Sequence, residues 1–193
     1  MPIIEGHAEV ESVPVLLRRL LEQLNAAHLN VCRPFRVKRN RIVQEAEIER
    51  AVQQAERDRE GVTAILIFLD ADDDPPEQLA ADLLRRARNV TRLPVAVALA
   101  VREFEAWFLG AKESLRGVRG IRTDATNPPD PESIRGAKER LSKNMPKSRR
   151  YLEVDDQPAL AARMDLDMAR RNCRSFDKFC RDVQSLVAAA LQA

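Results

Sequence analysis

The stretch LIFLDADDDPP, residues 66–76, decides the fold that the sequence predicts. Its apolar half belongs to residues 62–69, a nearly continuous apolar run that is typical of a strand buried on both faces of a parallel sheet. Asp70, Asp72, Asp73 and Asp74 follow at once. At an effective dielectric of about 20, two unit charges about 4 Å apart repel by about 4 kcal/mol. Such a cluster is either fully solvated or arranged to bind a cation.

Strand and helix patterns alternate on both sides of this stretch. Three more segments have strand character: residues 2–4, 31–38 and 94–101. Apolar residues recur at helical spacing in residues 13–24, after an expected N-cap at Ser12, and again in residues 45–59, 76–89, 104–111 and 175–191. We therefore predict an α/β fold with a mostly parallel central sheet of about four strands, helices on both faces and a helical C-terminal extension.

The length of 193 residues suits one well-buried domain with a modest appendage. We expect an α/β core in residues 1–111, a basic irregular insert with a short helix near residues 134–143 in residues 112–156, and a C-terminal helical segment packed on the core in residues 157–193. No run approaches the roughly 18 apolar residues of a membrane span, and the start of the sequence lacks a basic-then-apolar leader pattern. The expected location is the cytoplasm, without membrane contact.

The insert is the basic part of the sequence. Residues 112–150 hold 11 Lys or Arg against 5 Asp or Glu, a net charge of +6, whereas residues 1–111 have a net charge of −3. This pattern fits a protein that binds a metal ion and contacts a polyanion, although a solvated surface or a docking surface for a partner protein stays open. The candidate nucleic-acid-binding residues are Lys138, Arg140, Lys143, Lys147, Arg149 and Arg150.

Acidic residues follow three of the expected strands at the point where each strand ends. In an open parallel sheet, these carboxyl ends and the loops after them form the ligand crevice. Carboxylates gathered there make a site of hard oxygen ligands, which suits Mg²⁺ or Mn²⁺. A polar cap before the helix that begins near Pro76 is the plainer alternative, but it explains Asp74 alone. The candidate metal ligands are Glu5, Glu9, Asp70, Asp72, Asp74, Glu103 and Glu105.

Three motifs carry a resemblance to a known family. EGHAE (residues 5–9), FLDADDD (68–74) and REFEAWFL (102–109) resemble the topoisomerase–primase (Toprim) domain, and most closely its version in the overcoming-lysogenization-defect (OLD) family of nucleases. The whole chain is also similar to an uncharacterised bacterial family related to these domains and found beside ATPase genes in defence-type settings. The resemblance implies a Toprim/Rossmann-like fold over residues 1–111.

The resemblance also implies roles for the acidic residues. Glu5 would be a general acid/base or a metal ligand, Glu9 a second ligand, and Asp70 and Asp72 would hold Mg²⁺. Glu105, with Glu103 as the second choice, would complete a second metal position. Two ions roughly 3.5–4 Å apart clamp the attacking and leaving oxygens in phosphodiester cleavage. The catalytic residues that we expect are therefore Glu5, Asp70 and Asp72.

The function expected from the sequence is an Mg²⁺-dependent or Mn²⁺-dependent nuclease that uses one or two ions and works with a separate ATPase. A homodimer is an open option. Two alternatives stay open: a Toprim-fold subunit that binds a partner with little catalysis, and a small-molecule phosphohydrolase. Tyr151, the single tyrosine, is expected to pack in the core. Nothing recognisable as a topoisomerase cleavage domain surrounds it, which argues against topoisomerase activity.

Overall fold

The sheet has four parallel strands, as the sequence predicted. The computed structural model describes residues 1–44, 46–57 and 61–192. Its strands lie in the order β2-β1-β3-β4, and every pairing is parallel. They are β1 (Pro2–Ile4), β2 (Phe35–Arg36), β3 (Ile65–Asp70) and β4 (Val95–Ala100). β1 and β3 are the inner strands, so their carboxyl ends are neighbours at the middle of one sheet edge.

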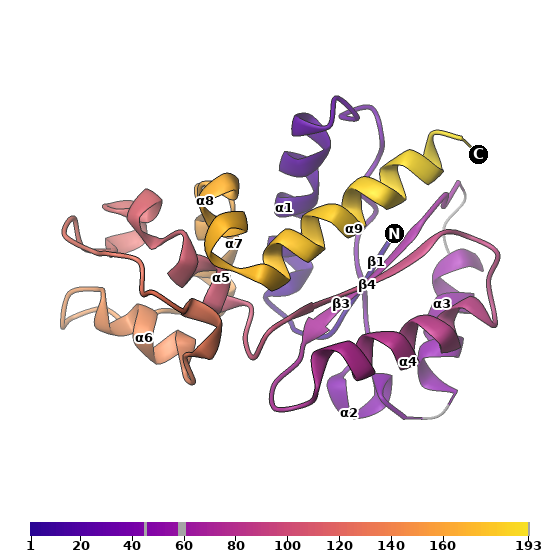
Figure 1. Cartoon of the computed structure of the whole chain (residues 1–193), viewed down its shortest axis with the longest axis horizontal. Helices are drawn as coiled ribbons and strands as arrows, with labels where there is room; N and C mark the ends of the chain where they lie inside the picture. The colour runs from indigo at the N-terminus through magenta and orange to yellow at the C-terminus, as the bar shows by residue number, and fades with distance from the viewer. Residues whose placement is uncertain (45, 58–60, 193) are drawn as a thin grey trace.

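Helices cover both faces of the sheet because the central strand is apolar on both sides. Ile65, Ile67 and Leu69 of β3 pack against α3 (Glu47–Arg57) and α4 (Pro76–Arg88). Leu66 and Phe68, which alternate with them, face the core formed with α1 (Glu9–Gln23) and α9 (Arg174–Ala190). Figure 1 shows α9 running across the sheet on one side and α4 on the other. The predicted C-terminal helix on the core is thus confirmed.

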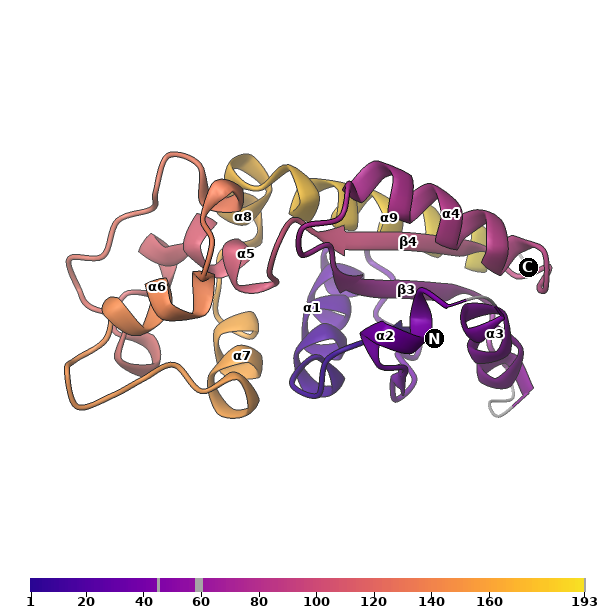
Figure 2. The same ribbon diagram turned by 90° about the horizontal axis from the view of Figure 1, so that it is seen from below.

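A helical lobe lies beyond the carboxyl ends of β3 and β4 (Figures 1 and 2). It contains α5 (Glu105–Gly110), α6 (Ala137–Lys143), α7 (Glu153–Ala161) and α8 (Leu166–Asn172), with three short 3-10 turns at Lys112–Leu115, Val118–Gly120 and Pro131–Ser133. The short helix expected near residues 134–143 is α6. The domain boundary expected between residues 156 and 157 falls inside α7, which packs against α1.

Several boundaries differ from the sequence prediction. The strand expected over residues 31–38 is confined to Phe35–Arg36, and a short helix, α2 (Arg39–Ile42), follows it. The N-cap prediction for Ser12 is wrong, because α1 begins at Glu9 and the buried Ser12 hydroxyl donates to Gln157 Oε1 at 2.6 Å. Residues 45, 58 and 59 of the helix predicted over 45–59 lie outside the described residues. In the described part of the chain, no helix is long and apolar enough to cross a membrane.

An aromatic cluster joins the lobe to the sheet. The ring of Trp107 in α5 lies 5.3 Å from that of Phe68 in β3 and 5.2 Å from that of Phe179 in α9, measured between centroids. The Trp107 indole N–H donates to Ser175 Oγ at 2.7 Å, so its single polar group is satisfied. This packing fixes the start of α5, and with it the position of Glu105, against the end of β3.

Candidate metal centre

Four carboxylates meet at the carboxyl edge of the sheet. Glu5 follows β1, Glu9 is the first residue of α1, Asp70 is the last residue of β3, and Glu105 is the first residue of α5. They come from distant parts of the sequence, yet Glu5, Glu9 and Glu105 all lie close enough to Asp70 for their charges to raise its pKa. The convergence expected from the strand ends is therefore present for these four residues.

Asp70 is at the centre of the group. Its Oδ1 accepts a hydrogen bond from the Phe104 backbone N–H at 2.8 Å, which fixes the carboxylate beside the loop after β4. Burial raises the pKa of Asp70 well above its ordinary value, and the charges of Glu9, Glu105 and Glu5 raise it further. A carboxylate in this position is costly to ionise unless a cation is near.

Glu9 is buried, with an exposed fraction of 6%, and lies against the loop that follows β1. Its Oε2 accepts from the Gly6 N–H at 2.8 Å. Burial, with the charges of Glu5 and Glu105, raises the pKa of Glu9 to about 7, although the Gly6 N–H acts in the opposite direction. A Cβ at position 6 would lie 2.6 Å from Glu9 Oε1, so a larger residue there would require this carboxylate to shift.

Glu105 is fully buried, and the lobe supplies its partners. Its Oε1 accepts from the Tyr151 hydroxyl at 2.8 Å and from Gln157 Nε2 at 3.1 Å. Tyr151 is buried as expected, but it also donates this hydrogen bond to Glu105. The sequence analysis predicted neither this contact nor that of Gln157. Residues 153–161 gave no helix prediction, so nothing placed Gln157 near the site. Burial raises the pKa of Glu105 above its ordinary value, while Lys138 and the Tyr151 hydrogen bond lower it.

Two cations border the carboxylates. Lys138 Nζ lies 2.8 Å from Glu153 Oε1, and although burial opposes its charge, Glu105, Glu153 and Asp70 raise the pKa of Lys138 above its usual value. Arg39 Nη1 lies 3.9 Å from Glu5 Oε2 and donates to the Asp70 carbonyl. The sequence reading had overlooked Arg39. Arg39 directly follows the strand expected over residues 31–38 and lies in a run of basic residues, and this position could have suggested that it belongs to the site.

Three of the predicted metal ligands do not belong to the group of four carboxylates. Asp72 is exposed, with a φ of 51°. Burial raises the pKa of Glu5, and the charge of Asp72 raises it further. Asp74 forms an ion pair with Arg39. Glu103 Oε1 accepts from the backbone N–H groups of Gly136 and Ala137 at 2.9 and 3.1 Å. Glu103 therefore holds the start of α6 in place of joining the four carboxylates.

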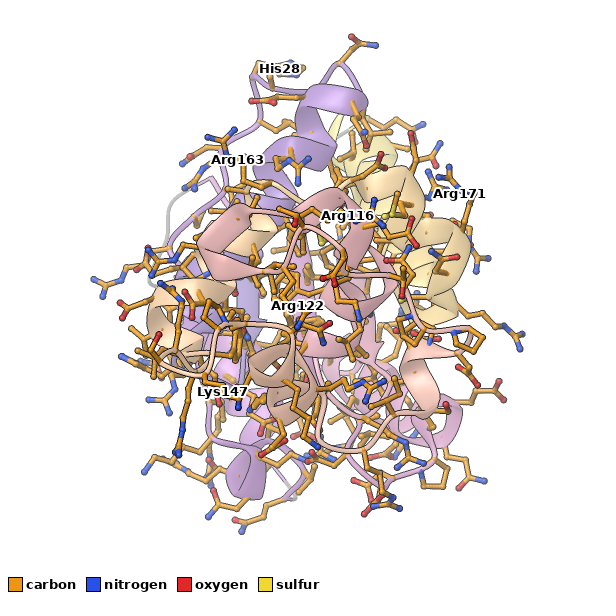
Figure 3. All side chains as sticks on the ribbon, turned by 90° about the vertical axis from the view of Figure 1, so that its left-hand side faces the viewer. His28, Arg116, Arg122, Lys147, Arg163 and Arg171 are labelled. Atoms are coloured by element: carbon orange, nitrogen blue, oxygen red, sulfur yellow. The ribbon has the colours of Figure 1, made fainter. Side chains whose placement is uncertain are left out.

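The predicted nucleic-acid-binding residues are spread over the lobe. Arg149 Nη2 lies 2.6 Å from Asp156 Oδ1, and Lys138 is paired with Glu153. Four others are exposed: Arg140, Lys143, Lys147 and Arg150. Figure 3 shows Lys147 on the side of the lobe that is turned away from the sheet, together with Arg116 and Arg122.

The chemistry of the four side chains fits a hard divalent cation. All donors are carboxylate oxygens, the ligand type that Mg²⁺ and Mn²⁺ prefer. Glu5 Oε2 and Glu105 Oε2 are buried and lack a hydrogen-bond partner within the described residues. In the same part of the chain, no three acidic, His or Cys side chains already have the geometry of a metal site. Binding would thus require the carboxylates to turn toward a shared ion.

The comparison with family models is decisive for classification. The model described as "Domain of unknown function (DUF4276)" matches residues 4–184, which is nearly the whole chain. The chain belongs to the DUF4276 family. The matched range includes all four carboxylates, Arg39, Lys138, Tyr151 and Gln157, so the candidate site lies inside the family domain. No curated protein and no solved structure gives a significant match.

Proposed function

We propose that this protein is a Toprim-like, Mg²⁺-dependent or Mn²⁺-dependent phosphodiesterase that cleaves nucleic acid. The observation that carries the proposal is the meeting of Glu5, Glu9, Asp70 and Glu105 at the carboxyl ends of β1 and β3, where Glu5 Oε2 and Glu105 Oε2 are buried without a hydrogen-bond partner among the described residues. Buried like charges at one edge are unfavourable by themselves, and a shared cation relieves them. In the proposal, the protein acts in the cytoplasm with a separate ATPase.

The four carboxylates would hold one or two ions. Divalent ions supply charge neutralisation and water activation in phosphodiester cleavage. Asp70 and Glu105 are the ligands that the fold positions most firmly, through the Phe104 N–H and through Tyr151 with Gln157. Glu5 is half-buried, whereas Glu9 and Glu105 are buried, so we assign proton transfer with solvent to Glu5. We assign to Lys138, whose charge acts on Glu105 and Asp70, the contact with a phosphate oxygen.

A second function has one observation in its favour. Lys138 brings a positive charge to the carboxylates, and its interaction with Glu105 and Asp70 partly neutralises them without a metal ion. A protein whose carboxylates are neutralised by Lys138 would keep the fold but catalyse little. It would act as a subunit that binds a partner protein or a second copy of itself. Activity and metal binding separate this alternative from the enzyme.

A nicking assay on plasmid DNA, single-stranded DNA and RNA with Mg²⁺ or Mn²⁺ tests the proposal. The wild type is compared with Asp70→Asn, and with Asp167→Asn, which removes an exposed carboxylate in α8. We expect cleavage that needs the metal, is lost in Asp70→Asn and is retained in Asp167→Asn. Equal cleavage by the wild type and Asp70→Asn would contradict the proposal. Metal binding without cleavage of any substrate would favour the partner-binding alternative.

A further inference from the structure

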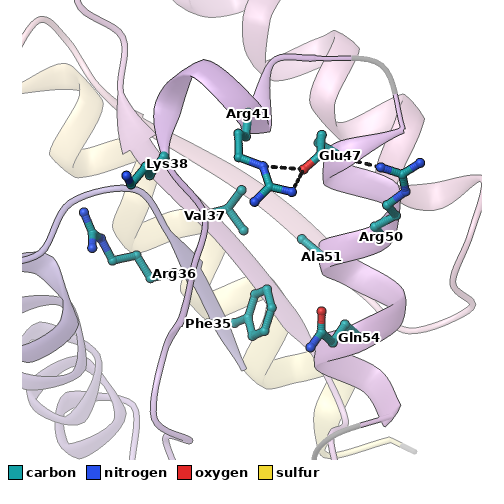
Figure 4. Close-up of a pocket in the computed structure, with 9 residues that line it drawn as sticks. All are labelled: Phe35, Arg36, Val37, Lys38, Arg41, Glu47, Arg50, Ala51 and Gln54. Carbon is teal, nitrogen blue, oxygen red and sulfur yellow. Dashed lines mark hydrogen bonds and ion pairs between the residues drawn. The ribbon is translucent and has the colours of Figure 1, made fainter.

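A groove lies along the free edge of the sheet, between β2 and α3 (Figure 4). Its volume is about 440 Å³, which falls within the roughly 300–1,000 Å³ of ligand-binding pockets. β2 is an edge strand, because its one sheet neighbour is β1. The cationic side chains that line the groove are exposed to solvent.

The groove combines an aromatic ring with an excess of positive charge. Figure 4 shows the half-buried Phe35 ring between the two walls, facing Ala51 and Gln54 of α3. The charged lining residues are Arg36, Lys38, Arg41, Arg50 and Glu47. Glu47 lies 2.7 Å from Arg41 and 2.8 Å from Arg50, so one carboxylate is shared by two guanidinium groups. With four cations and one anion, the lining has a net charge of +3.

The groove adjoins the candidate metal centre. Arg36 Nε donates to the Glu5 carbonyl at 3.1 Å, so the guanidinium group touches the loop that bears a carboxylate of the site. Arg39, one residue beyond Lys38, contacts Glu5 and Asp70. Arg36 and Lys38 project from the side of β2 opposite Phe35 (Figure 4), so a strand that crosses this edge of the sheet would pass Arg36 beside the loop that bears Glu5. The outward-facing basic residues of the lobe offer no comparable route.

We propose that this groove binds single-stranded nucleic acid and leads it to the carboxylates, an inference that rests on the proposed function. Arg36 and Lys38 contact backbone phosphates, and a base stacks on Phe35. Proteins that hold single strands combine a basic track with aromatic platforms in this way, because every base has a face that can stack. A duplex would not offer its bases to a ring inside a groove, so single strands are favoured over duplex DNA.

The test is fluorescence anisotropy with a labelled oligothymidylate in EDTA, where cleavage cannot occur. The double variant Arg36→Glu/Lys38→Glu should weaken binding at least about tenfold and lower the slope of log affinity against log salt by about 2. Phe35→Leu keeps an apolar side chain but removes the ring, and should weaken binding by roughly tenfold. Arg163→Glu/Arg171→Glu, which alters two exposed cations elsewhere, is the matched control and should bind as the wild type does. Circular dichroism confirms that each variant is folded.

Three results of the binding assay would overturn the groove assignment. These are unchanged binding in Arg36→Glu/Lys38→Glu, an equal loss in Arg140→Glu/Lys147→Glu on the lobe, or equally tight binding of a labelled acidic peptide. The groove proposal and the enzyme proposal can be refuted independently. Binding that depends on the groove without cleavage in Mn²⁺ would refute the enzyme but not the groove, whereas cleavage that is unaffected by the groove variants would refute only the groove.

Discussion

The Tyr151 hydroxyl donates a hydrogen bond of 2.8 Å to Glu105 Oε1, and both side chains are buried. This contact ties the loop before α7 to the first residue of α5. It directs one oxygen of Glu105 into the lobe and leaves Oε2 without a partner in the described residues. The lobe is therefore part of the candidate site, because it determines which carboxylate oxygen is available to a cation.

Tyr151→Phe should make Glu105 a poorer ligand without abolishing activity. The change removes a buried hydrogen bond and should cost about 1–3 kcal/mol of unfolding free energy. The Tyr151 hydrogen bond lowers the pKa of Glu105, so its loss should raise that pKa and weaken Mn²⁺ binding at neutral pH. Urea unfolding and Mn²⁺ titration measure both effects. Complete loss of cleavage with normal Mn²⁺ binding would instead indicate that the hydroxyl takes part in the reaction.

Gly6→Ala should disturb Glu9 specifically. The added Cβ would lie 2.6 Å from Glu9 Oε1, so the carboxylate must move and its hydrogen bond from the Gly6 N–H is strained or lost. We expect a loss of about 1–3 kcal/mol in unfolding free energy and weaker Mn²⁺ binding. A double-mutant cycle with Glu9→Ala provides the control, because the smaller side chain removes the clash. Additive effects of the two changes would show that the steric argument is incorrect.

In the absence of divalent ions, stability should fall as the pH rises. The pKa of Glu9 is raised from 4.5 to about 7, so between these values the folded protein holds a proton that the unfolded chain has released. The contribution is complete below the unfolded pKa and is lost as the pH rises through the folded pKa, at about 1.4 kcal/mol per pH unit. The pKa values of Asp70 and Glu105 are also raised, and act in the same direction.

Urea unfolding in EDTA between about pH 5 and about pH 8 measures this dependence. Glu9→Gln should reduce the slope, and Asp167→Asn should leave it unchanged. Saturating Mn²⁺ should restore stability at the upper end, because a bound cation favours ionised carboxylates. A stability that stays level or increases with pH in the wild type would be inconsistent with a buried carboxylate group.

Glu103→Gln tests whether this residue is a ligand or a helix cap. Its carboxylate accepts from three consecutive backbone N–H groups at the start of α6, those of Gly136, Ala137 and Lys138. Loss of a charged cap of this kind should cost about 0.5–2 kcal/mol of unfolding free energy. Mn²⁺ affinity should remain within a few-fold of the wild type. A loss of Mn²⁺ binding as large as that in Asp70→Asn would return Glu103 to the ligand set.

The fold was predictable because β3 is apolar on both faces and α1, α4 and α9 have clear helical spacing. Those patterns indicate a covered parallel sheet without tertiary information. Two helices of the lobe were missed for a physical reason. α7 contains Pro158 and a run of acidic residues at its start, so its apolar face is weakly marked, and α8 has a length of seven residues, too short for a clear helical spacing. Their stability comes from packing on α1 and α9.

The site was predictable only in outline. Strand ends placed Glu5, Asp70 and Glu105 at one edge, and those positions follow from topology alone. Strand topology alone does not distinguish Glu105 from Glu103, two residues away, because the choice depends on the direction in which α5 starts; the preference for Glu105 came from the family resemblance. It also could not reveal Arg39 or Gln157, whose partners lie 31 and 52 residues away in the chain.

The most direct test of the central claim is a Mn²⁺ titration followed by electron paramagnetic resonance. Free Mn²⁺ gives a signal that decreases on binding, so no substrate, partner protein or turnover is required. We predict saturable binding to the wild type and to Asp167→Asn, with loss of that binding in both Asp70→Asn and Glu105→Gln. Binding that is absent from the wild type, or that is the same in all four proteins, would contradict a shared cation site at Glu5, Glu9, Asp70 and Glu105.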